Sequence, residues 1–333
     1  MQRNGFLSAL GALCAAAAPR VALAAAPPVT IRAAATLDDD ATPFIWATEN
    51  GNFRRNGIDA SITRGTSGAA IAAGVIGGAY EIGKSSITTL CTAHARGVPL
   101  IWIAPAGEYD SSMAMRLAMI VKSDSPIKTG TDLNGKTIGV SGLNDIFSLT
   151  SRAWADKNGG DSSTIKLVEI PMAQAGLAVE AGRVDCAVVI QPFLDAAVAG
   201  GKVRVLADPN SAVAPRFMQA AWFTSTDFAA KNPAAIDGFI RVMRDASIYA
   251  NSHHAETAKL LLSYLNITVP LNSRILLGVR FNPDLIQTLI DMQVRYKMLP
   301  APMNARDLIY PAALVDSRSV NPSRLGFAQS AEG

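Results

Sequence analysis

Small and hydroxyl side chains stand at the start of a predicted helix. Thr66, Ser67 and Gly68 precede the Ala-rich stretch 69–76, whose composition predicts a helix. The first N–H groups of a helix have no intrahelical acceptor, so this position suits the binding of a hydrogen-bond-accepting solute. Ordinary helix capping by the hydroxyl groups explains the same residues. The residues alone leave both interpretations open.

Two other segments predict strands that end where a ligand would bind. Residues 132–142 and 181–192 each combine a turn, a short β-branched run and an abrupt stop, which is typical of a strand buried between helices. Ligands of open α/β sheets bind beyond the carboxyl ends of such strands. Asn144, Asp145 and Gln191 are therefore candidate ligand contacts. Asn144 or Asp145 would equally serve as a helix cap.

Acidic side chains follow a predicted strand over residues 29–34. Asp38, Asp39 and Asp40 form either a solvated turn or the rim of a binding crevice at that strand end. Carboxylates in a crevice repel an anion and attract a cation. With Asp145 beside a helix start, these acids predict a cationic, zwitterionic or hydrogen-bond-donating ligand rather than a bare inorganic anion.

A second acidic group follows the apolar run 100–104. Glu108, Tyr109 and Asp110 lie at the end of that predicted strand. Tyr109 could stack on a ligand or hydrogen-bond it. Alternatively, it lies at the rim of the site and makes no ligand contact.

Residues 78–85 match the phosphate-binding pattern G-x-x-x-x-G-K-[ST] letter for letter. The context argues against a nucleotide site, because a helix precedes Gly78 and the predicted strand 80–82 falls inside the pattern. Lys84→Ala is accordingly expected to change stability by less than about 1 kcal/mol, as surface substitutions do.

Neither metal binding nor covalent catalysis is predicted. His253 and His254 are adjacent rather than four residues apart, so one helix face cannot present both to a metal. No G-x-S-x-G pattern is present. The sequence thus predicts no catalytic residue, metal or cofactor.

The elements fall into two similar halves. Gly78–Glu81 and Gly182–Asp185 repeat the order helix, glycine, strand, acid about a hundred residues apart. The section from Ala220 onward reads as helical and is expected to fold back on the first half. We expect a first lobe from residues 27–117 plus 219–315, a second lobe from 118–218, and a loose tail at 316–333.

Composition and the amino terminus indicate an exported protein. The 333 residues are 49% hydrophobic, enough for two cores. Arg3, an apolar stretch and Ala22-Leu23-Ala24 predict a signal peptide over residues 1–24, and hence a periplasmic protein. Without it, 28 basic and 27 acidic residues give a net charge of +1, which does not favour nucleic acid as a partner. Cys91 and Cys186 are expected to be buried in different lobes and unbridged.

Five segments together resemble the periplasmic solute-binding proteins of the nitrate/sulfonate/taurine type. They are residues 43–59, 93–99, 132–140, 181–192 and 229–233. The resemblance implies an α/β protein of the type II periplasmic-binding-protein fold, with two lobes joined by two hinge strands that close on a ligand. It also implies contacts near Ser85 and Gln191. The family often has an aromatic or charged residue where Gln191 stands, so the ligand itself is not carried over.

Residues and resemblance together predict the substrate-binding protein of an ABC importer, a monomer that delivers a small organic solute to a permease and its ATPase. The solute would be sulfonate- or taurine-like, an amine or a heterocycle. Two alternatives are an enzyme similar to thiamine-pyrimidine synthases and a ligand-sensing subunit of a receptor kinase. The hinge is expected near residues 113–119 and 215–221. The candidate ligand contacts are Asp38, Asp39, Thr66, Ser67, Gly68, Ser85, Tyr109, Asp110, Asn144, Asp145 and Gln191.

Overall fold

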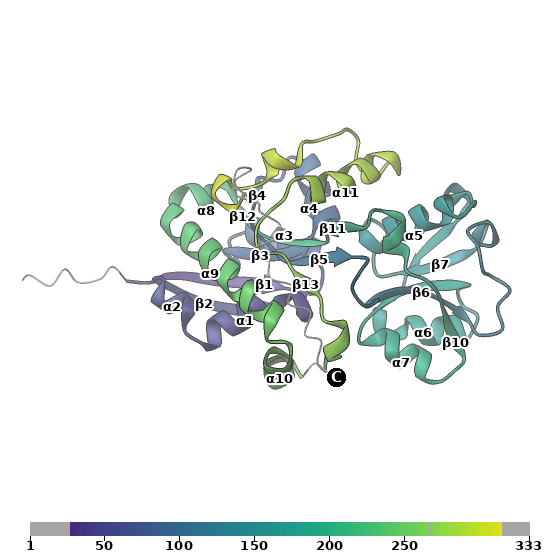
Figure 1. Ribbon diagram of the computed structural model, residues 1–333. Coiled ribbons are helices and arrows are strands. Elements are labelled where there is room, and N and C mark those ends of the chain that lie inside the picture. Colours follow the sequence, from purple (N-terminus) through teal and green to yellow (C-terminus); the bar gives the residue numbers. More distant parts are fainter. Residues whose placement is uncertain (1–26, 267, 315–333) are drawn as a thin grey trace, which may run out of the picture.

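Two five-stranded sheets, each covered by helices, form two α/β lobes (Figure 1). The computed structural model describes residues 27–266 and 268–314. The predicted signal peptide and the whole of the predicted loose tail therefore lie outside the described residues.

The first sheet has the order β2 (Ile58–Arg64), β1 (Val29–Ala35), β3 (Ile82–Ser86), β12 (Ala220–Ser225), β4 (Leu100–Pro105). The second has the order β10 (Val203–Ala207), β6 (Leu117–Lys122), β9 (Cys186–Ile190), β7 (Thr137–Val140), β8 (Lys166–Glu169). β1 pairs in parallel with β2 and β3, and β7 pairs in parallel with β8 and β9. The predicted buried strands in 132–142 and 181–192 are thus confirmed as neighbours in one sheet.

β12 corrects the prediction that the chain is helical from Ala220 onward. It runs antiparallel between β3 and β4 in the first sheet. Trp222 and Phe223 are fully buried, because the strand has helices on both faces. A strand buried on both faces shows no polar alternation, so its sequence resembles that of a buried helix. The chain after Ala220 thus adds a strand to the first sheet.

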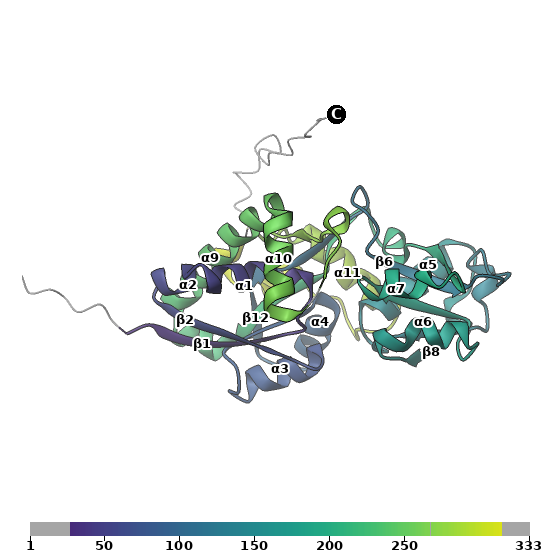
Figure 2. The ribbon, with the colours of Figure 1, turned by 90° about the horizontal axis from the view of Figure 1, so that it is seen from below.

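Helices cover both faces of each sheet. Around the first sheet lie α1 (Thr42–Glu49), α2 (Asn52–Arg55), α3 (Gly68–Ile76), α4 (Ile87–Ala95), α8 (Thr226–Lys231), α9 (Pro233–Ser252), α10 (His254–Leu265) and α11 (Asp284–Arg295). Around the second lie α5 (Ile146–Lys157), α6 (Met172–Glu180) and α7 (Phe193–Ala199). Figure 2 shows α9 and α10 on one side of the first sheet and α3 on the other. Short 3₁₀ turns complete the chain: η1 (Asp39–Ala41), η2 (Thr131–Leu133), η3 (Ser162–Thr164), η4 (Pro209–Ala212), η5 (Leu271–Ser273), η6 (Ala305–Leu308) and η7 (Pro311–Ala313).

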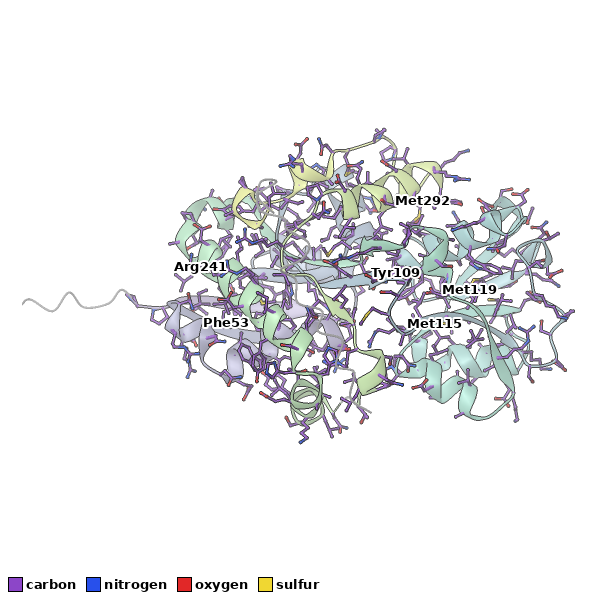
Figure 3. The ribbon with its side chains drawn as sticks, viewed as in Figure 1. Phe53, Tyr109, Met115, Met119, Arg241 and Met292 are labelled. Atoms are coloured by element: carbon purple, nitrogen blue, oxygen red, sulfur yellow. The ribbon has the colours of Figure 1, made fainter. Side chains whose placement is uncertain are left out.

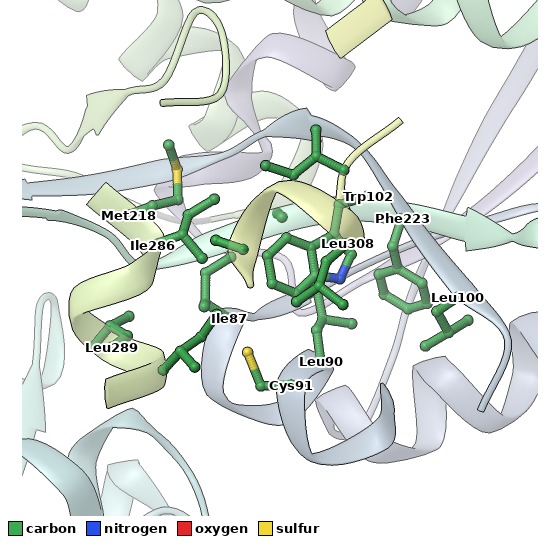
Figure 4. Packing of buried hydrophobic residues seen from close by; sticks show 14 of the residues in the cluster. Ile87, Leu90, Cys91, Leu100, Trp102, Met218, Phe223, Ile286, Leu289 and Leu308 are labelled. Atoms are coloured by element: carbon green, nitrogen blue, oxygen red, sulfur yellow. The ribbon is translucent and has the colours of Figure 1, made fainter. Parts of the chain in front are cut away.

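One apolar core extends from the first lobe into the second. Leu90 and Trp102 of the first lobe pack with α11 and η6, as Figure 4 shows. Ile146 and Leu149, in the first turns of α5, belong to the same cluster. The carboxyl end of β7, which leads into α5, is therefore held against α4 of the first lobe.

A small third sheet lies where the chain crosses between the lobes, with the order β11 (Arg216–Met218), β5 (Gly107–Asp110), β13 (Leu276–Leu277). The chain enters the second lobe between β5 and β6 and returns between β10 and β11. The first crossing, 111–116, overlaps the segment 113–119 predicted as a hinge, whereas the second, 208–215, meets the predicted segment 215–221 only at residue 215. No helix among the described residues is long and apolar enough to cross a membrane.

The two cysteines of the described chain are unbridged and buried, as predicted. Cys91 lies on α4 of the first lobe and Cys186 on β9 of the second. Burial raises the pKa of both thiols. Neither is therefore poised as a thiolate nucleophile.

Candidate functional site

The start of α3 lies against the end of β3, as the strand order requires. Ser67 caps the helix by accepting a hydrogen bond from the Ala70 N–H at 3.2 Å. Gly68 is packed so closely on Ser85 that a Cβ there would collide with the Ser85 hydroxyl. Ser67 is therefore an ordinary helix cap. The remaining first-turn N–H groups of α3 have no acceptor within the helix. Thr66 and Ser67 are exposed beside them.

Two candidate ligand contacts carry a buried polar atom with no hydrogen-bond partner among the described residues. They are Ser85 Oγ at the end of β3 and Gln191 Oε1 just after β9. The Gln191 amide nitrogen donates to Asp195 at 2.7 Å, which leaves the carbonyl oxygen as the open group. Buried polar atoms are nearly always paired in folded proteins. Each lobe therefore contributes one unpaired polar atom at the end of a strand.

Acidic residues after β1 form two buried ion-pair clusters. In the first, Lys84 is 1% exposed and its ammonium contacts Asp38 at 2.5 Å and also Asp40. Burial lowers the pKa of Lys84, and the charge of Asp38 opposes that shift. The prediction that Lys84 is a dispensable surface residue is wrong, because its side chain points from a central strand into this cluster.

The second cluster is centred on Asp39, whose carboxylate is 1% exposed. It lies 2.6 Å from Arg274 and 3.0 Å from Arg116. The backbone N–H of Ile275 also donates to it at 3.0 Å. The Asp39 carboxylate thus has all of its partners within the protein.

These pairings correct the electrostatic interpretation of the sequence. Asp39 and Asp40 do not form a solvated turn, since both are buried in or beside η1. Three cations, on Lys84, Arg116 and Arg274, balance the three carboxylates. The end of β1 therefore carries no surplus of negative charge, and the argument that it selects a cationic ligand loses its basis.

Arg116 connects the two lobes at the crossing into β6. Its guanidinium contacts Asp39 and the carbonyl of Ser273, and its own carbonyl accepts from the Gln191 N–H at 2.8 Å. The candidate residues Asp39 and Gln191 thus both contact Arg116, Asp39 at its guanidinium and Gln191 at its backbone carbonyl. Arg116 and Arg274 were missed by the sequence reasoning, which considered Lys84 only as part of the phosphate-binding pattern. Arg116 had one local signal, its place within the predicted hinge segment 113–119.

Asp145 caps α5. Its carboxylate accepts from the N–H groups of Phe147 and Ser148 at 2.9 and 3.0 Å, and from the Ser141 hydroxyl at 2.6 Å. Burial, the largest effect, raises the pKa of Asp145 to about 6 despite these hydrogen bonds. Asn144 beside it is exposed.

Tyr109 and Asp110 lie in β5, at the junction of the lobes. The Tyr109 hydroxyl donates to Asp208 of the second lobe at 2.9 Å, and the ring lies 5.0 Å from that of Phe217. Asp110 accepts from the N–H and the hydroxyl of Ser112 at 2.9 and 2.7 Å. Both side chains already have partners that belong to the crossing itself.

The Walker-like pattern at 78–85 has the wrong geometry for a phosphate loop. Gly78 follows the end of α3, and the strand predicted at 80–82 lies at Ile82–Ser86. The last four residues of the pattern are therefore part of β3. Lys84, the residue that would contact phosphate, pairs with carboxylates instead. Glu108 is likewise paired, with Arg216 at 2.6 Å.

Solved structures with the same architecture are periplasmic binding proteins. The aliphatic sulphonate binding protein SsuA from Escherichia coli aligns with a TM-score of 0.69 and 19% identity, over 86% of this chain and 99% of that one. The nitrate-binding protein NrtA from Synechocystis aligns with a TM-score of 0.68 and 15% identity, over 86% of each chain. The two-lobed fold is therefore that of the periplasmic binding proteins.

A family profile described as NMT1/THI5 like matches residues 38–257. The chain belongs to this family, which confirms the resemblance to solute-binding proteins. A putative aliphatic sulfonates-binding protein of Escherichia coli K12 is 24% identical over 193 residues. That match spans 58% of the length of each protein.

Proposed function

We propose that the chain is the exported substrate-binding protein of an ABC importer. It captures a small organic solute bearing an oxyanion, of the alkanesulfonate class, between its lobes and delivers it to a permease served by an ATPase. The observation that carries the proposal is the pair of unpaired buried atoms, Ser85 Oγ and Gln191 Oε1, at strand ends of the two lobes. The Ser85 hydroxyl and the free N–H groups at the start of α3 can donate to an oxyanion, and the Gln191 oxygen can accept from a donor elsewhere on the solute.

The alternative of an enzyme similar to thiamine-pyrimidine synthases receives less support. Both thiols are buried and in different lobes, with their pKa values raised. Among residues 27–266 and 268–314, no three His, Cys, Asp or Glu side chains are grouped so as to hold a metal. A sensing role uses the same fold and the same site, and differs only in the membrane partner.

Ligand-dependent thermal unfolding tests the proposed site. Four probes have similar size: ethanesulfonate and propionate are monoanions, taurine is a zwitterion, and ethylammonium is a cation. A ligand at about 100 times its Kd stabilises the folded state by about 2.7 kcal/mol. We expect stabilisation by the sulfonate and none by ethylammonium, with a smaller radius of gyration in X-ray scattering as the lobes close.

Gly68→Ala probes the start of α3, because the added methyl group collides with Ser85 Oγ. Gly200→Ala is the matched control, since a Cβ there meets nothing within 4 Å. Ser85→Ala removes the unpaired hydroxyl without adding bulk. We expect Gly68→Ala and Ser85→Ala to weaken sulfonate binding at least about tenfold, and Gly200→Ala to leave it unchanged. Binding of ethylammonium in place of ethanesulfonate would show the proposed charge to be wrong.

A further inference from the structure

A cavity on the first lobe, outside the proposed site, is lined by three arginines. It has a volume of about 270 Å³ and lies among α9, the end of β4, the segment after β13, and η7. Arg241 and Arg244 come from α9, and Arg280 comes from the segment after β13. Figure 3 shows Arg241 on the first lobe, away from Met115 at the junction of the lobes.

The charges around the cavity are not balanced. Asp237 is the one acidic residue of the lining, so the walls carry a surplus of positive charge. Among the described residues, neither Arg241 nor Arg280 has a carboxylate within 4.0 Å, whereas Arg244 pairs with Asp245 at 2.8 Å. Two buried basic residues of this lobe, Lys84 and Arg274, have close acidic partners. Arg241 and Arg280 are exposed and are therefore available to a ligand.

The remaining walls are apolar, with side chains that include Ile240, Met243 and Val279. Guanidinium groups bind carboxylate and phosphate through paired, parallel hydrogen bonds. The cavity is slightly smaller than the usual range of ligand pockets, which begins at about 300 Å³. The shape and charge together suit a small anion with a short carbon skeleton.

We propose that this cavity is a second binding site, which takes a small organic oxyanion, a carboxylate or phosphate, through Arg241 and Arg280. The site is independent of the solute site between the lobes. Gly278 also lines the cavity, and its N–H donates to the Ala106 carbonyl beside the hinge strand β5.

Methyl NMR of protein labelled at methionine separates the two sites. Met243 lines the cavity, and Met115 lies on the crossing between the lobes, so each reports on one site. The probes are butyrate, inorganic phosphate and butylammonium, added at constant ionic strength with NaCl. Met243→Leu assigns the cavity signal.

We expect butyrate or phosphate to shift the Met243 signal saturably, with Kd on the order of 1 mM or tighter, while Met115 does not move. Butylammonium has the skeleton of butyrate with the opposite charge, and we expect it to leave Met243 unshifted. Arg241→Ala/Arg280→Ala should weaken binding at least about tenfold. Arg183→Ala/Arg306→Ala removes two exposed arginines elsewhere and should leave binding intact.

Several outcomes would overturn the second site. An unsaturable shift, or an equal effect of both double variants, would indicate general charge screening. An unmoved Met243 signal, or an equal response to butylammonium, would exclude an oxyanion site. Failure of ethanesulfonate to shift the Met115 signal would contradict the proposed function alone, because Met115 does not line the cavity.

Discussion

Replacing Lys84 tests whether the buried ion pairs after β1 hold the first lobe together. Lys84 lies on the third strand of the sheet, opposite Trp222 of β12, with its ammonium between Asp38 and Asp40. Lys84→Met keeps most of the side-chain volume and removes the charge. The carboxylate of Asp40, 8% exposed, is then left in the interior without its cation.

The size of the effect follows from the burial of each partner. Removing one partner of a buried ion pair typically costs about 3–5 kcal/mol. Asp38 is 55% exposed and can return to water, so its share of the loss is small. We therefore expect Lys84→Met to lower the free energy of unfolding by about 3 kcal/mol. Asp40→Asn should cost less, and Asp38→Asn less than about 1 kcal/mol.

Urea unfolding followed by tryptophan fluorescence measures these differences. Trp154 lies in the second lobe, so a Trp154→Phe background confines the signal to Trp46, Trp102 and Trp222 of the first lobe. Lys84→Met combined with Asp40→Asn removes both charges, and the double variant should be less destabilised than the sum of the two single changes. A loss under about 1 kcal/mol for Lys84→Met, or strictly additive single changes, would refute the importance of this cluster.

Two further predictions concern Asp145 and the amino terminus. Asp145 has a pKa raised from 3.8 to about 6, so the folded state retains a proton that the unfolded chain has lost. Between about pH 4 and 6 its ionisation should therefore lower the stability of the wild type, by at most about 3 kcal/mol. Asp145→Asn keeps a capping side chain and should flatten this fall in melting temperature against pH; parallel profiles would contradict the assignment. Amino-terminal sequencing of the protein recovered from a periplasmic fraction should start close to Ala24, and an intact Met1 there would rule out cleavage.

The strands and the order of the lobes were predictable because their signals are local. Residues 137–140 and 186–190 are β-branched runs between turns, and each forms a strand with helices on both sides. Gly182 ends a helix with a φ of 69°, a backbone conformation that glycine adopts without strain. β12 escaped prediction because its place is decided by two strands more than a hundred residues earlier in the chain.

The places of the polar residues on helices and strands were predictable, and their pairing was not. Thr66, Ser67 and Gly68 do begin a helix at a strand end, as their types indicate. The partner of Asp39 is Arg274, 235 residues away, and no local pattern relates the two. A carboxylate in a sequence does not show whether it is free or paired.

This difference decides which charge the site selects. A cluster of acids predicts attraction of a cation only while the carboxylates remain unpaired. Here Lys84, Arg116 and Arg274 neutralise them within the protein, and Asp145 is engaged at the start of α5. What remains for a ligand is the set of helix N–H groups at Gly68 and the uncharged oxygens of Ser85 and Gln191. The N–H groups and the Ser85 hydroxyl can donate to an oxyanion, whereas the Gln191 oxygen only accepts and suits a donor elsewhere on the ligand, such as the ammonium group of taurine. The pairing of the acids thus leads to the proposed sulfonate class.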